Sequence, residues 1–200
     1  MSSSFFRSTC IVSIISFLIL FFISAFFIPF IPGIENIDLN SISSSNISFG
    51  IDTTGFAWPT PGYKTITSEF GYRRAPTSGA STYHSGIDIA APTGSNIIAT
   101  FSGVVSYTGF YGAGGFTVIV KNDNLSAEYC HVSPQFIVRV GQTVKKGQII
   151  AKVGPKNVYG VSNNPYRDSN GNPTNGATTG PHLHFSIKKD GKAVNPFNYF

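Results

Sequence analysis

Short runs of β-branched and aromatic residues, each closed by glycine, proline or asparagine, make up most of the sequence after Trp58. Residues of the first kind favour strands and residues of the second kind favour turns, while helix signals are nearly absent there. The predicted strands are residues 64–70, 96–107, 116–121, 127–131, 148–153 and 182–188. This spacing predicts an all-β, antiparallel domain of about 140 residues whose sheet is closed or sandwiched.

The last predicted strand carries two histidines, His182 and His184, separated by one residue. Side chains two positions apart in a strand point to the same face, so both imidazoles should project from one surface. Leu183 and Phe185 should then face the core. The chain has four histidines, and the hypothesis is that His84 and His131 join this pair.

His84 and Asp88 are separated by three residues, one of them glycine, in a loop that enters a strand at residues 87–90. Imidazole nitrogen and carboxylate oxygen are both good zinc ligands, but a catalytic site needs a third protein ligand and an open position for water. His184 is available as that third ligand. Two neutral imidazoles and one carboxylate would leave the site positively charged and lower the pKa of bound water toward about 7.

The sequence has no His-Glu-x-x-His helix, and its only glutamates are Glu35, Glu69 and Glu128. A histidine is therefore the more natural general base, and His131 and His182 remain for this role. His182 shares a strand face with the candidate ligand His184. His131 ends a run that could be the neighbouring strand.

Each feature also has a simpler explanation. His84 and Asp88 could be a hydrogen-bonded pair that stabilises a turn, and a His-x-His pair also suits copper, nickel or structural zinc. Cys130 beside His131 allows a cysteine-nucleophile interpretation. Neighbours in a strand point to opposite faces, however, which argues against a cysteine acting with that histidine.

The region between Ser8 and Ile34 contains no charged residue, and about 20 apolar residues suffice to span a bilayer as a helix. Arg7 before it and acidic residues after it favour an N-terminus inside and the remainder outside the cell membrane. We expect a short cytoplasmic N-terminus at 1–9, a single transmembrane anchor at 10–32, an extracytoplasmic linker at 33–57 and the domain at 58–200. The alternative is a cleaved signal peptide and a secreted protein, but Ala25-Phe26-Phe27 is a poor cleavage site.

Charge and loop composition add two expectations. From Trp58 onward, 13 Lys and Arg face six Asp and Glu, a formal charge of +7, which suits anionic wall polymers or lipid headgroups better than nucleic acid in an exported chain. The lysines could equally keep strand edges soluble. The segment 154–180, rich in Gly, Asn, Pro, Thr and Ser, is either a wall beside the active site or disordered.

Several motifs together resemble the M23 family of zinc metallopeptidases, the lysostaphin-like or LytM-type enzymes that cut peptide cross-links of bacterial peptidoglycan. These motifs are His84-x-x-x-Asp88, Tyr129-x-His131-x-Ser133, Thr-Gly-Pro-His-Leu-His-Phe at 179–185, Phe-Gly-Tyr-Arg at 70–73, and the hairpin at 144–151 shared with biotinyl and lipoyl carrier barrels. The resemblance covers residues 58–200. It implies a peptidase domain of the barrel-sandwich hybrid type with long active-site loops.

The resemblance also implies the roles of the site residues. One zinc ion per domain would be held by His84, Asp88 and His184, while His131 and His182 flank the metal water, activate it and stabilise the oxyanion. Cys130 and Val132 stand where the family commonly has a small residue and leucine, which puts no catalytic role in doubt.

The expected function is therefore that of a membrane-anchored zinc endopeptidase acting on peptidoglycan stems and cross-links. The alternative is an inactive LytM-type module that binds the wall or activates another hydrolase. A carrier domain would need a lysine in a Met-Lys-Met or Asp-Lys-Ala setting, and the sequence has neither. A secretion or conjugation component that opens the wall would use the same chemistry with other partners.

Overall fold

The structure is a computed structural model that describes residues 55–77 and 79–200. The predicted cytoplasmic segment 1–9 and transmembrane anchor 10–32, and most of the linker 33–57, lie outside the described residues, and the boundaries of these segments stay predictions. No helix in the described part of the chain has the length and hydrophobicity that a membrane span requires.

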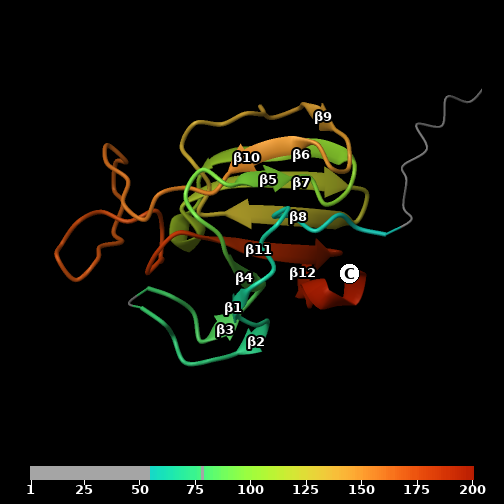
Figure 1. The fold of residues 1–200 in the computed structure, drawn as a ribbon. Helices are drawn as coiled ribbons and strands as arrows, with labels where there is room; N and C mark the ends of the chain where they lie inside the picture. The colour runs from blue at the N-terminus through green and yellow to red at the C-terminus, as the bar shows by residue number, and fades with distance from the viewer. Residues whose placement is uncertain (1–54, 78) are drawn as a thin grey trace, which may run out of the picture. The chain divides into compact units, whose positions relative to one another are not determined.

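The predicted all-β, antiparallel architecture is confirmed (Figure 1). The large sheet has eight strands in the order β1-β4-β11-β8-β7-β6-β9, with β12 paired to β11. Its strands are β1 (Ile66–Ser68), β4 (Ile87–Ala90), β6 (Gly103–Phe110), β7 (Phe116–Asn122), β8 (Leu125–Cys130), β9 (Thr143–Val144), β11 (His182–Lys189) and β12 (Lys192–Val194). Two further antiparallel pairs are β5 (Asn96–Ile98) with β10 (Ile149–Lys152), and β2 (Gly71–Tyr72) with β3 (Tyr83–His84). Two 3₁₀ helices, η2 (Gly112–Gly114) and η3 (Pro196–Tyr199), lie between β6 and β7 and after β12.

The centre of the large sheet separates a hydrophobic core from a polar face. Along β11 the side chains of Leu183, Phe185 and Ile187 are fully buried in the core. The core also takes in Ile97 of β5 and Ile150 of β10, so the small β5–β10 pair covers apolar residues of the large sheet. The alternate residues of β11, beginning with His182 and His184, lie on the other face, as strand periodicity predicts.

One predicted strand is two strands in the structure. Residues 96–107 were expected to run without a break, but β5 ends at Ile98 and β6 begins at Gly103, and the two strands belong to different sheets. Gly103 passes close to β7, because a Cβ there would lie 2.3 Å from the carbonyl oxygen of Lys121. The dipeptide Ser102-Gly103 at the break is a turn signal, which the prediction of one continuous strand passed over,.

Candidate metal centre

Three strands bring one imidazole or carboxylate each to a common point. His184 of β11 lies directly opposite Asp88 of β4 in the antiparallel register, so the two side chains share a face of the sheet. His84 ends β3 and reaches the same point across the turn Ser85-Gly86. Gly86 lies against β11, since a Cβ at this position would lie 2.3 Å from the carbonyl oxygen of Phe185.

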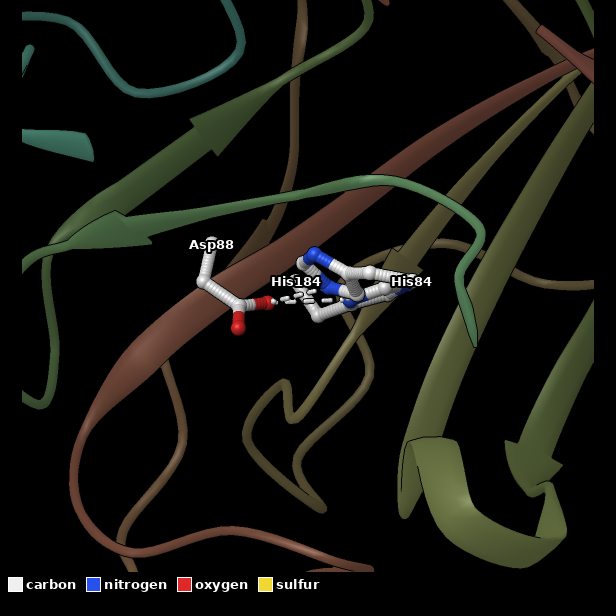
Figure 2. A group of neighbouring side chains, drawn as sticks. All are labelled: His84, Asp88 and His184. Carbon is white, nitrogen blue, oxygen red and sulfur yellow. Dashed lines mark hydrogen bonds and ion pairs between the residues drawn. The ribbon is translucent and has the colours of Figure 1, made fainter. Parts of the chain in front are cut away.

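The donor atoms of these three residues almost touch. His84 Nε2 lies 2.8 Å from His184 Nδ1 and 3.1 Å from Asp88 Oδ1, and His184 Nδ1 lies 2.9 Å from Asp88 Oδ1. Figure 2 shows the three side chains directed toward one another. His84 is only 2% exposed, so its ring is fixed from all sides.

The donor set fits a zinc ion. His84 Nδ1 lies 2.7 Å from the carbonyl oxygen of Glu69, to which it must donate, so Nε2 presents a lone pair to the other donors. Burial would raise the pKa of Asp88, but the neighbouring imidazoles of His184 and His84 outweigh burial and hold that pKa well below its usual range. Two imidazole nitrogens and one carboxylate oxygen match the ligand preference of zinc.

His131 and His182 lie beside this cluster, so the structure brings all five candidate site residues together. The ring centroids of His131 and His182 are 4.6 Å apart, and His182 Nε2 lies 3.6 Å from Asp88 Oδ1. His131 Nδ1 donates to the carbonyl oxygen of Asn175 at 2.6 Å, and His182 Nδ1 donates to that of Gly180 at 2.8 Å. In both rings Nε2 is therefore the nitrogen left to accept a proton.

Burial keeps these two rings neutral. It lowers the pKa of His131 to about 3, helped by the neighbouring rings of His182 and His184. Burial also lowers the pKa of His182, although the charge of Asp88 acts in the opposite direction. At neutral pH both rings are therefore neutral, and each Nε2 keeps a free lone pair.

His131 differs from the expectation that it ends a strand. Strand β8 stops at Cys130, and His131 has a positive φ of 58°, which few residues other than glycine adopt. Its backbone N–H donates to Gly114 and its carbonyl oxygen accepts from Gly154. These two contacts with the neighbouring loops hold the backbone in this conformation and turn the imidazole toward His182.

Asn175 is a functional residue that sequence reasoning missed. It is fully buried in the segment 154–180, and its carbonyl oxygen holds His131. Its side chain accepts from the N–H of Phe116 and donates to the carbonyl oxygen of Val132, at 2.8 and 3.0 Å. One asparagine in a loop rich in asparagine gives no signal of such a role.

We expect Asn175→Ala to lower the free energy of unfolding, because the N–H of Phe116 and the buried carbonyl oxygen of Val132 both lose a partner, and the buried group alone costs about 1–3 kcal/mol. The loss can be measured by urea unfolding. Asn170→Ala is the matched control, because that side chain is exposed in the same loop. Equal stability of the two variants would contradict the role assigned to Asn175.

The five residues line a groove of about 830 Å³. Strands β4, β8 and β11 contribute to its lining, as do residues 111–114 of the glycine-rich loop and residues 177 and 179–181 before β11. The end of the segment 154–180 thus forms part of the wall. The middle of that segment is folded on itself, with an isolated bridge between Arg167 and Pro173.

Cys130 lies on the same face as His184, which corrects the argument that strand alternation turns it away from the site. The two residues are direct partners in the β8–β11 register, and Cys130 lines the groove. Burial raises the pKa of its thiol to about 12. A nucleophilic role is therefore disfavoured because the thiol stays protonated, since the thiolate is the reactive form.

Cys130 should consequently resist alkylation by iodoacetamide at pH 8 in the folded protein and react fully in urea. Peptide mapping by mass spectrometry follows Cys130 separately from Cys10, and the urea sample is the control. Rapid modification of Cys130 in the folded protein would show that its thiolate is accessible.

Comparison with known proteins finds a family and relatives that match most of the described part of the chain. Residues 82–196 match Peptidase family M23. The chain is 32% identical over 135 residues to the DD-carboxypeptidase/endopeptidase Mpg of Neisseria meningitidis serogroup B, which covers 67% of this chain and 26% of Mpg. It is 35% identical over 144 residues to the murein hydrolase activator NlpD of Escherichia coli, which covers 71% of this chain and 30% of NlpD.

Among solved structures, a zinc-containing peptidase from Vibrio cholerae matches with a TM-score of 0.55 and 29% identity, covering 70% of this chain and 39% of that protein. The chain spans less than a third of the length of either curated relative. The similarity is therefore to one domain of larger proteins.

Proposed function

The chain belongs to peptidase family M23, and from this we propose that it is a zinc metalloendopeptidase that hydrolyses peptide cross-links of bacterial peptidoglycan. The observation that carries the proposal is the convergence of His84, Asp88 and His184 with two further neutral histidines in one groove. A module that only binds the wall has no need for two bases beside a metal site.

The residues divide into holders of the metal and carriers of the proton. His84 Nε2, Asp88 Oδ1 and His184 Nδ1 would hold zinc, which supplies Lewis acidity to the peptide carbonyl and to water. His131 and His182 each present Nε2 to the groove. One ring can accept the proton of the attacking water, and the resulting imidazolium can return it to the leaving amine. A protonated ring can also donate a hydrogen bond to the oxyanion.

The direct test is to incubate the full chain with purified peptidoglycan, with zinc or with a chelator, and to identify new peptide termini by mass spectrometry. We expect zinc-dependent release of peptides, and the new termini would identify the bond that is cut. Absence of release with zinc bound would contradict the proposal.

The similarity to NlpD, whose name describes a murein hydrolase activator, favours a second candidate. In this role the groove would bind a partner hydrolase or the wall without cutting it. The same incubation separates the two, because an activator releases nothing alone and increases release by an added murein hydrolase. The presence of all five site residues favours the peptidase.

We also propose that residues 10–32 anchor the protein in the cell membrane, with the N-terminus inside and the peptidase domain outside. The uncharged apolar stretch and its basic N-terminal flank support this arrangement,. Peptidoglycan would then be the natural partner, with anionic wall polymers as further contacts of the basic domain and no role for nucleic acid. Protease digestion of intact cells tests the topology.

A further inference from the structure

The two oxygens of the Asp88 carboxylate have different environments. Oδ1 faces the donor nitrogens of His84 and His184 at 3.1 and 2.9 Å. Oδ2 points away from them and accepts a hydrogen bond from Arg73 Nη1 at 3.0 Å. A carboxylate held by one oxygen cannot rotate freely, so the other oxygen stays directed at the two imidazoles.

Arg73 is itself held in place by groups outside the metal cluster. Its Nη1 also donates to Ser68 Oγ, and its backbone N–H donates to the carbonyl oxygen of Thr82 at 2.8 Å. Ser68 Oγ in turn lies 3.3 Å from His84 Nδ1. Ser68 and Arg73 therefore link His84 Nδ1 to Asp88 Oδ2, the two atoms of these candidate ligands that face away from the cluster.

The position of Arg73 has a cost that this contact can explain. Its Nε is buried without a hydrogen-bond partner, one of two such side-chain atoms in the described residues. Leaving a buried donor unsatisfied disfavours folding, and an arginine directed into solvent would avoid the cost. The guanidinium is thus placed where Nη1 reaches Asp88, although this position leaves Nε without a hydrogen bond.

A guanidinium beside a metal site has two opposing effects. Its charge repels a divalent cation, whereas its hydrogen bond holds the carboxylate ready for binding. We propose that the second effect dominates and that Arg73 is a positioning residue, which fixes Asp88 for the metal ion through Oδ2. The proposal rests on the zinc site of the proposed function. It assigns a role to the Phe-Gly-Tyr-Arg motif, for which the mechanism has no other use.

The experiment measures zinc affinity of the full chain by competition with a chromophoric chelator, so that it does not depend on activity. Arg73→Gln should weaken zinc binding by about 10–100-fold, the range found for partners that orient metal ligands. Arg73→Lys keeps the charge but replaces the Nη1 donor by an ammonium group on a different stem, so its affinity should be intermediate. Arg74→Gln is the matched control, because Arg74 lines the same groove, is exposed and makes no ion pair with the described residues.

The outcomes separate this inference from the function on which it rests. Zinc binding by Arg73→Gln that equals or exceeds that of Arg74→Gln would overturn the positioning role, while wild-type affinity would still support the metal site. Failure of the wild-type chain to bind zinc would overturn both. If Arg73→Gln does not fold, Arg73→Lys decides, since affinity equal to wild type would show that the placement of the Nη1 donor does not fix Asp88 and would overturn the inference.

A second measurement distinguishes positioning from a general structural effect. In an Asp88→Ala background, Arg73→Gln should cause no further loss of the residual zinc affinity, because the residue through which Arg73 acts is absent. A further loss of the same size as in the wild-type background would show that Arg73 acts by another route and would overturn the inference.

Discussion

His184→Ala is expected to abolish zinc binding and peptidoglycan hydrolysis together, whereas His182→Ala should abolish most of the activity and leave zinc bound. The two residues lie two positions apart on one face of β11, so each variant is the structural control for the other. His184 Nδ1 lies within 2.9 Å of both other candidate donors. His182 Nε2 is farther away, at 3.6 Å from Asp88 Oδ1.

The magnitudes follow from the two roles. Loss of one of three protein ligands removes the ion that polarises the substrate, so His184→Ala should have no activity above that of chelator-treated protein. Loss of a general base costs about 10²–10⁴-fold in rate, which is the range expected for His182→Ala. Zinc content by elemental analysis and peptide release from peptidoglycan are the two measurements.

Two results would contradict these assignments. Full zinc stoichiometry in His184→Ala would remove it from the ligand set. Loss of zinc in His182→Ala, with the fold unchanged by circular dichroism, would mean that this ring binds the metal and does not only carry a proton.

The site could be predicted from sequence where strand periodicity decides the geometry. His182 and His184 share a face because they are two residues apart, and the adjacent strand brings Asp88 opposite His184. The ligand set itself also needed the family resemblance, because spacing alone leaves other metals and a simple turn as explanations.

The parts that sequence reasoning missed depend on backbone conformation and long-range contacts. His131 lies one residue beyond the end of β8 with a positive φ, so a face assignment based on alternation fails there and placed Cys130 on the wrong face. Asn175 lies 44 residues from His131, and Arg73 lies 15 residues from Asp88. Neither separation has a periodic pattern that would connect the two residues.

Gly86→Ala should destabilise the domain and weaken zinc binding at the same time. The added methyl group would lie 2.3 Å from the carbonyl oxygen of Phe185 and 2.8 Å from its carbonyl carbon. Both are backbone atoms of β11, which is hydrogen-bonded to β4 and β8 and cannot move alone. The turn between β3 and β4 must therefore shift, and His84 shifts with it.

The loss of stability should be about 3 kcal/mol, at the upper end of the range for overpacked sites, because no flexible side chain is available to move aside. Urea unfolding of the zinc-free protein measures this loss, and chelator competition measures the accompanying fall in affinity. Gly180→Ala is the control for stability, since a Cβ at Gly180 meets no atom within 4 Å. If Gly86→Ala unfolds at the same urea concentration as Gly180→Ala, the added methyl group does not clash with β11. The close approach of the β3–β4 turn to β11 would then not fix the position of His84. If it is less stable but binds zinc normally, the turn supports the fold without positioning His84.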